Sequence, residues 1–181
     1  MARTGIQFTA SDYKALPETA PRMELLDGEF EMAPAPSTRH QTVTLNVAVM
    51  LREFLAHAAT GKVFISPCDV YLDDADVVQP DVLVLLNPHL EREREDGIHG
   101  APDLVVEVIS KTSGAQDMTL KRAIYRRGGV TEYWIVDPSS ETVLSCRLQE
   151  PGEPRLLRIG ESIASPLLPG FAGTLSEVFA R

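Results

Sequence analysis

Apolar residues recur at intervals of three or four across residues 39–58, which is the spacing of one face of an α-helix. These positions are Val43, Val47, Met50, Leu51 and Phe54. Thr38 followed three residues later by Gln41 forms a capping box, a common start of a helix. The pattern therefore predicts one amphipathic helix over residues 39–58.

Before this helix, Asp27-Gly28 separates two runs that contain apolar residues, and both turn residues tolerate the positive φ of a tight turn. Residues 22–32 are therefore predicted to form a β-hairpin. Its core face would carry two apolar pairs, Leu25 with Phe30 and Met23 with Met32. Glu24 would lie opposite Glu31, where like charges are destabilising unless they are solvated, bridged by a basic group or turned toward a metal site. Solvation is the default expectation.

After Gly61 the pattern changes to short β-rich runs bounded by Pro and Asp. The expected strands are KVFISP, CDVYLDD, VVQPDVLVLLNP, residues 103–110 and TEYWIVDP, followed by a hairpin of residues 141–148 and 154–160. A second helix is expected from a cap at Asp117 to Gly128-Gly129, and the charged stretch 91–100 is expected to be a solvated loop or short helix. This order predicts a mixed α/β or α+β sheet domain.

Composition bounds what such a domain can be. A chain of 181 residues with 44% hydrophobic content has the size of one domain, expected over residues 1–181 with a core at about 20–175. Without a secretion signal or an apolar run of ~20 residues, we expect a soluble cytoplasmic protein that does not enter a membrane. Cys68 and Cys146 lack metal-ligand spacing and are expected to be reduced thiols. The formal charge of −9 argues against non-specific coating of nucleic acid, which depends on Lys and Arg.

Two carboxylates interrupt strands that are otherwise apolar. Glu107 falls in the run from Leu104 to Ile109, which is apolar on both faces, as in a central strand covered on both sides. Asp81 shares a face with apolar residues of its own expected strand. Because a buried carboxylate is costly unless it is paired or bound to a metal, the two predict a site for Mg²⁺ or Mn²⁺. The equally weighted alternative is that Asp81 is exposed and Glu107 pairs with an arginine.

Lys121 supplies a third element. It lies one turn after Asp117 and one turn before Tyr125, on an apolar stripe, so its ammonium is expected to point toward the sheet. A lone helical lysine more commonly extends to solvent, but the two carboxylates favour the inward direction. There it would orient an attacking water, help to deprotonate it and balance the negative charge on a phosphate.

Other residues are candidates of lower rank. Arg122 and Arg126, one turn apart beside Lys121, are expected to form a small phosphate-binding patch. His40, in the first turn of the long helix, could reach the same site, although a lone histidine is more often structural. The second-tier residues are Glu24, His40, Asp117 and Tyr125.

Pro80-Asp81 before an apolar strand, Glu107 in a later strand and a lysine in the next helix together resemble the PD-(D/E)xK nuclease superfamily. The phrases MELLDGEF, QPDVLVL, APDLVVEVIS and GVTEYWIVDP resemble more particularly a bacterial family of putative restriction endonucleases. The resemblance implies a core of helix, three-stranded antiparallel meander, helix and fourth strand, with the N-terminal hairpin as an addition. It also implies a metal site formed by Asp81, Glu107 and the backbone carbonyl of Val108.

One position departs from the superfamily pattern. The signature lysine would stand at position 109, where this chain has Ile109. The resemblance implies that Lys121, from the following helix, takes over that role, and that Glu24 is an additional acidic or positioning group.

The leading hypothesis is a Mg²⁺-dependent endonuclease that hydrolyses DNA phosphodiester bonds. The alternatives are a nuclease-like fold used as a binding or assembly module without turnover, which the acidic charge favours, and a phosphodiesterase acting on RNA or another phosphoester. The apolar region 131–146 is either internal core or one side of a twofold interface. Because nucleases that cut both DNA strands often work as pairs, a homodimer is expected.

Overall fold

The computed structural model describes residues 7–17, 19–32, 35–109 and 115–181, and the statements below concern those residues. A central sheet has the strand order β12-β11-β10-β9-β6-β3. Its strands are β3 (Gly61–Ile65), β6 (Val82–Leu86), β9 (Leu104–Val108), β10 (Glu132–Asp137), β11 (Thr142–Arg147) and β12 (Arg155–Arg158). β10 runs parallel to β9, whereas the other neighbours are antiparallel. The mixed-sheet fold class is confirmed, with β3, β6 and β9 forming the three-stranded meander.

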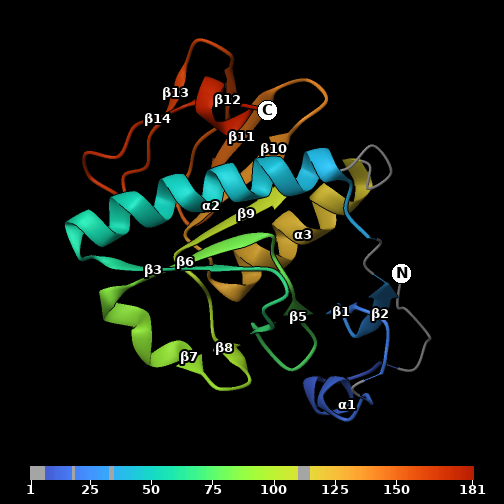
Figure 1. Cartoon of the computed structure of the whole chain (residues 1–181). Coiled ribbons are helices and arrows are strands. Elements are labelled where there is room, and N and C mark those ends of the chain that lie inside the picture. The colour runs from blue at the N-terminus through green and yellow to red at the C-terminus, as the bar shows by residue number, and fades with distance from the viewer. Residues whose placement is uncertain (1–6, 18, 33–34, 110–114) are drawn as a thin grey trace.

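Two long helices cover opposite faces of this sheet, as Figure 1 shows: α2 (Thr38–Ala58) and α3 (Ala115–Gly128). Alternate residues of a strand enter the two cores, so Val82 packs on the α2 side and Leu83 on the α3 side. The long helix begins one residue earlier than expected, because Ser37 is its cap and accepts a hydrogen bond from the His40 backbone N–H at 3.2 Å.

A second sheet has the order β2-β1-β5-β4-β8-β7. Its strands are β1 (Met23–Leu26), β2 (Glu29–Met32), β4 (Val70–Tyr71), β5 (Val77–Val78), β7 (Glu93–Arg94) and β8 (Gly97–His99). The hairpin has the predicted register, and its turn residues Asp27 and Gly28 have φ of 52° and 76°.

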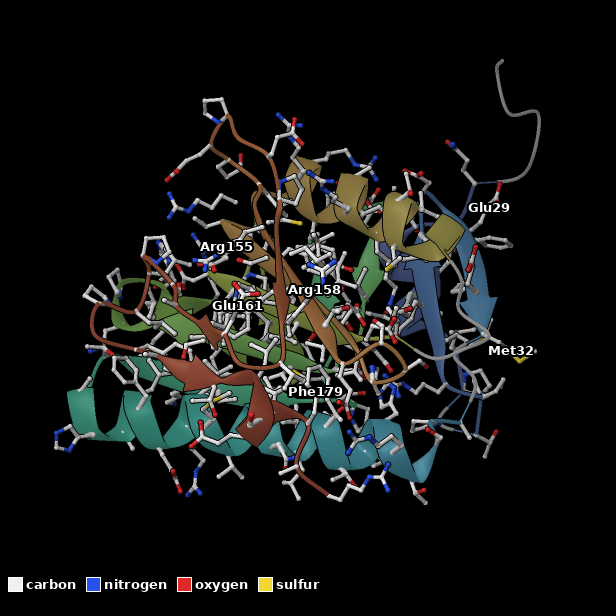
Figure 2. All side chains as sticks on the ribbon, turned by 90° about the horizontal axis from the view of Figure 1, so that it is seen from above. Glu29, Met32, Arg155, Arg158, Glu161 and Phe179 are labelled. Carbon is white, nitrogen blue, oxygen red and sulfur yellow. The ribbon has the colours of Figure 1, made fainter. Side chains whose placement is uncertain are left out.

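Met32 does not lie in the core as expected. It is 70% exposed at the free edge of the second sheet, where Figure 2 shows it pointing outward. The short helix α1 (Ala10–Lys14) brings Tyr13 against Leu25 and Phe30, but this apolar cover does not include Met32.

Two predictions about the middle of the chain were wrong. The run VVQPDVLVLLNP forms two strands, β5 and β6, which belong to different sheets, because Pro80 between them has no N–H for a ladder. The charged stretch 91–100 holds the end of the 3₁₀ helix η1 (Asn87–Arg92) and then the hairpin of β7 and β8. Parallel pairing of β8 with β4 supplies tertiary support that local charge patterning does not reveal.

The second half of the chain follows the prediction closely. β10, β11 and β12 form as expected, and the chain closes with β13 (Ser162–Ile163), β14 (Gly173–Thr174) and α4 (Leu175–Val178). α3 begins at Ala115, so Asp117 lies inside the helix and is not its cap; its side chain and Ser110 lie outside the described part. Most apolar residues of 131–146 belong to the internal core: Tyr133, Trp134, Ile135, Val136 and Val143 are buried, and Leu144 is partly buried.

Cys68 and Cys146 are free thiols. Within the described ranges, no helix combines the length and apolar character needed to cross a bilayer.

Candidate active site

Asp81 lies immediately before β6 and is held against the end of β9. Its Oδ2 accepts a hydrogen bond from the backbone N–H of Val108 at 2.8 Å, and its Oδ1 lies 3.0 Å from Nε2 of His40 on α2. The residue is only 8% exposed, so the alternative of a water-exposed Asp81 is wrong. Because the N–H and C=O of one strand residue face the same neighbour, the Val108 carbonyl is also directed toward the β6 edge.

Glu107 lies in β9 on the face that α3 covers, and it is close enough to Asp81 for that charge to affect its pKa. Its Oε1 accepts hydrogen bonds from the Tyr125 hydroxyl at 2.6 Å and from Lys121 Nζ at 3.1 Å. Both donors come from α3, where residues four apart lie on one face. The buried carboxylate therefore has a cationic partner, and that partner is Lys121 and not the arginine of the alternative.

Lys121 joins the central sheet to the N-terminal hairpin. Its ammonium nitrogen lies 2.8 Å from Oε2 of Glu24 on β1 and 3.1 Å from Oε1 of Glu107. Glu24 also accepts a hydrogen bond from the Gln79 backbone N–H at 2.7 Å. The default expectation of a solvated Glu24 is thus wrong: pairing of β1 with β5 brings this carboxylate to α3.

The electrostatics of this group are dominated by burial and by an excess of carboxylates. Burial raises the pKa of Glu107 to about 7; Lys121 opposes this shift, while Asp81 and Glu24 add to it. Burial alone would lower the pKa of Lys121, but the charges of Glu107 and Glu24 raise it above its ordinary value. Burial and then Glu107 raise the pKa of Tyr125, so its hydroxyl stays a donor. Lys121 is a fixed cation between the carboxylates of Glu24 and Glu107.

Within the described part of the chain, no group of three or more His, Cys, Asp or Glu side chains is arranged to hold a metal. Mg²⁺ does not require such a group, since it is commonly held by one or two carboxylates, waters and substrate phosphates. Asp81, Glu107 and the carbonyl of Val108 are hard oxygen donors of this kind. The excess of carboxylates over ammonium in the cluster also favours a divalent cation, so these residues fit the ion.

The two arginines predicted to bind phosphate lie elsewhere on α3. One residue along a helix is a rotation of ~100°, so Arg122 leaves the helix in a different direction from Lys121. Burial raises the pKa of the Cys146 thiol on β11, and the charge of Arg122 opposes that shift, which places Arg122 near β11. Arg126 is exposed, and its carbonyl accepts a hydrogen bond from Gln149 at 2.9 Å.

Two residues beside the site were missed in the sequence. The guanidinium of Arg22 donates to the side-chain oxygen of Gln79 at 2.6 Å and to its backbone oxygen at 3.2 Å. Gln79 in turn holds Glu24 through its N–H and Asp69 through its amide at 2.7 Å. A polar residue in the apolar run VVQPDV was the available signal, because a buried amide needs partners just as a carboxylate does.

A meander with a carboxylate at the start of one strand and within the next, crossed by a lysine-bearing helix, defines a restriction-endonuclease-like fold. The chain belongs to the Uma2 family, described as putative restriction endonuclease, whose model matches residues 10–176. It is also similar to a crystal structure described as a putative nuclease belonging to DUF820 from Anabaena variabilis. That likeness has a TM-score of 0.80 at 20% identity, and covers 96% of this chain and 98% of the other. No match was found among curated proteins.

Proposed function

We propose that this protein is an endonuclease that hydrolyses DNA phosphodiester bonds with Mg²⁺ or Mn²⁺ as its cofactor. The observation that carries the proposal is the cluster that joins Asp81, Glu107 and Lys121 from three different elements. Membership in a family of putative restriction endonucleases supports this chemistry for the cluster.

In this proposal Asp81, Glu107 and the Val108 carbonyl hold the ion. A bound divalent ion polarises a phosphoryl oxygen and lowers the pKa of water. His40 orients Asp81 through its 3.0 Å contact, and Tyr125 orients Glu107 through its 2.6 Å hydrogen bond. These contacts thus fix the orientation of both carboxylates.

Lys121 acts as a positive charge beside the phosphate. Because its ammonium already forms ion pairs at 2.8 and 3.1 Å, its role is to offset the charge that grows during attack, and not to remove a proton. Glu24 positions this ammonium. Arg122 and Arg126 are proposed to contact phosphates further along the strand, outside the cluster.

Cleavage of a supercoiled plasmid with Mg²⁺ or Mn²⁺ tests the proposal. Wild type should nick or linearise the plasmid, while Asp81→Asn and Glu107→Gln should not. Asp103→Asn is a matched control, because Asp103 is also buried, also accepts a backbone N–H at 2.8 Å and also contacts a histidine. Equal cleavage by wild type and the two site variants would refute the mechanism.

One observation favours a module without turnover: Lys121 already pairs with both Glu24 and Glu107. Calorimetric titration with Mn²⁺, alongside cleavage assays on DNA and RNA, separates the two functions. Heat that is lost in Asp81→Asn, without cleavage of either nucleic acid, would identify a binding module. Cleavage of RNA alone would correct the substrate.

A homodimer remains a prediction that rests on the pairing of nucleases that cut both DNA strands, because most apolar residues of 131–146 are buried in the core and do not form an interface. Light scattering of the purified chain measures this directly. A mass of one chain, 19.8 kDa, would refute the dimer.

A further inference from the structure

A pocket of about 460 Å³ opens beside Asp81, at the N-terminal part of α2 and the end of β3. This volume lies within the range of small-molecule sites, ~300–1,000 Å³. The lining residues that carry the argument are Arg22, Thr44, Leu45, Ile65, Ser66 and Asp81. Asp81 is thus shared between this pocket and the proposed active site, so a group bound here lies next to the reacting phosphate.

The pocket wall holds two hydroxyl groups without partners. Thr44 Oγ1 and Ser66 Oγ are buried and make no hydrogen bond with any residue of the described part. Thr44 is itself only 9% exposed. Buried polar atoms are nearly always paired, and these two atoms have almost no accessible surface, so a bound group reaches them only when rotation of the side chain turns the hydroxyl toward the pocket.

The rim of the pocket is apolar and open to solvent. Leu45 on α2 is 58% exposed and Ile65 at the end of β3 is 52% exposed, with Pro36 and Pro67 also lining the pocket. A mainly apolar lining with a few polar groups is typical of small-molecule sites, and it suits a flat ring with polar edges. A nucleobase has this character, and enzymes hold extruded bases between apolar side chains while hydrogen-bonding their edges.

Arg22 adds a positive charge at the same pocket. Its guanidinium is held by two neutral oxygens of Gln79, and within the described ranges no carboxylate pairs with it. A phosphate next to a bound base could therefore use this charge. This matters in a chain with a formal charge of −9, which gains little from non-specific contacts with a duplex backbone.

We propose that this pocket receives the base of an unpaired nucleotide beside the bond to be cut, so that the substrate class is single-stranded or locally unpaired nucleic acid. The inference rests on the proposed nuclease function for the bond that is cut, but its binding step stands by itself. A paired base cannot enter, because it remains stacked within the duplex unless it is flipped out. DNA and RNA strands share this chemistry.

Fluorescence anisotropy in EDTA measures binding without any turnover. The probes are fluorescein-labelled single strands of twelve dT or twelve rU nucleotides, and the same dT strand annealed to a complementary strand of dA nucleotides. Wild type should bind a single strand at least ~10-fold more tightly than the duplex, since burial of one base contributes about that factor. The tighter of the two single strands identifies the preferred sugar.

Two double variants test the pocket. Leu45→Ala with Ile65→Ala removes the rim and should weaken single-strand binding ~10-fold while leaving duplex binding unchanged. Thr44→Val with Ser66→Ala removes the unpaired hydroxyls and should weaken it by a similar factor. Because those hydroxyls have no protein partner, this second variant should melt at or above the wild-type temperature, so weaker binding would not reflect unfolding.

Leu156→Ala with Ile159→Ala is the matched control for the rim. These residues are 42% and 48% exposed at β12, where Figure 2 shows Arg155 and Arg158, and they do not line the pocket. This control should bind like wild type. Equal affinity for strand and duplex, or pocket variants that bind like wild type, would overturn the inference even if plasmids are cut. If the pocket variants weaken single-strand binding but wild type shows no Mn²⁺-dependent cleavage, the nuclease function is refuted and the base-binding pocket is still supported.

Discussion

The strand pair β6 and β9 has the same arrangement at both of its ends: an aspartate that accepts a backbone N–H from the neighbouring strand and contacts a histidine. Asp81 precedes β6 and accepts the N–H of Val108 from β9, while Asp103 precedes β9 and accepts the N–H of Leu86 from β6, both at 2.8 Å. Each aspartate is buried and contacts a histidine: His40 at 3.0 Å in the first case and His89 at 2.7 Å in the second. Each therefore ties down the end of the neighbouring strand.

Among the described residues, only one of these two ends gathers a group of buried charges that includes a cation. At the Asp81 end, β1 and α3 bring Glu24, Glu107 and Lys121 together. At the Asp103 end, no group of that kind is found among the described contacts; the bonds there are structural, such as Glu132 N–H to the Asp103 carbonyl at 3.0 Å. A buried Asp–His pair by itself thus stabilises the end of a strand. Catalysis is expected only where other elements add charged residues to such a pair.

The largest predicted difference between the two ends is in cleavage. Glu107→Gln and Asp81→Asn should lower the rate of Mn²⁺-dependent plasmid cleavage by ~1,000-fold, since loss of an ion's ligand removes several kcal/mol of transition-state stabilisation. Asp103→Asn should retain the wild-type rate per folded molecule. A similar loss in all three variants would mean that the two ends do not differ in function.

Removal of the shared cation tests the charge at the Asp81 end. Lys121→Met leaves Glu24 and Glu107 buried without their partner and should lower the free energy of unfolding by about 3 kcal/mol, as for other broken buried pairs. Lys14→Met, which breaks an exposed pair with Asp96, should cost less than ~1 kcal/mol. Urea denaturation measures both, and equal costs would show that the Lys121 cluster is not tightly coupled.

The two histidines give a smaller and more specific contrast. His40→Ala should weaken Mn²⁺ binding ~10- to 100-fold in calorimetry, because groups that orient a metal ligand have effects of this size. His89→Ala should leave Mn²⁺ affinity unchanged, since it orients Asp103 only. Loss of Mn²⁺ affinity in His89→Ala would indicate that the ion binds at the Asp103 end, contrary to the proposal.

The smallest expected effect is on stability at the Asp103 end. Asp103→Asn weakens hydrogen bonds to Leu86 and His89 and should lower the free energy of unfolding by about 1 kcal/mol. Thermal or urea unfolding measures this change. An effect below the error of the measurement would show that this aspartate does not lock the strand end.

Much of the fold could be predicted from local pattern. The hairpin register follows from Asp27-Gly28, and the 39–58 helix follows from its apolar spacing, because turn chemistry and period act within a few residues. The division of residues 77–88 between two sheets could not be predicted, since it depends on which distant strands pair with each half. The same holds for the hairpin within residues 91–100.

The candidate site shows this limit most clearly. Glu107 lies within an apolar central strand and Glu132 begins one, and neither position by itself reveals which partner the carboxylate meets. Glu132 accepts hydrogen bonds from Trp134 Nε1 at 2.6 Å and from the Ser165 hydroxyl at 2.5 Å, which makes it a structural residue. Glu107 meets Lys121 and Tyr125 instead, and so belongs to the charged cluster.

The sequence by itself determined that Asp81 and Glu107 fall in apolar runs and that either carboxylate, if buried, would need a partner, because desolvating a charge is costly in any fold. Which partner each one meets was decided only by the tertiary structure. The crossing of α3 over β9 and the pairing of β1 with β5 place Lys121 between Glu24 and Glu107. The contact between Glu24 and Lys121 joins residues 97 apart in the chain, so no local pattern could specify it.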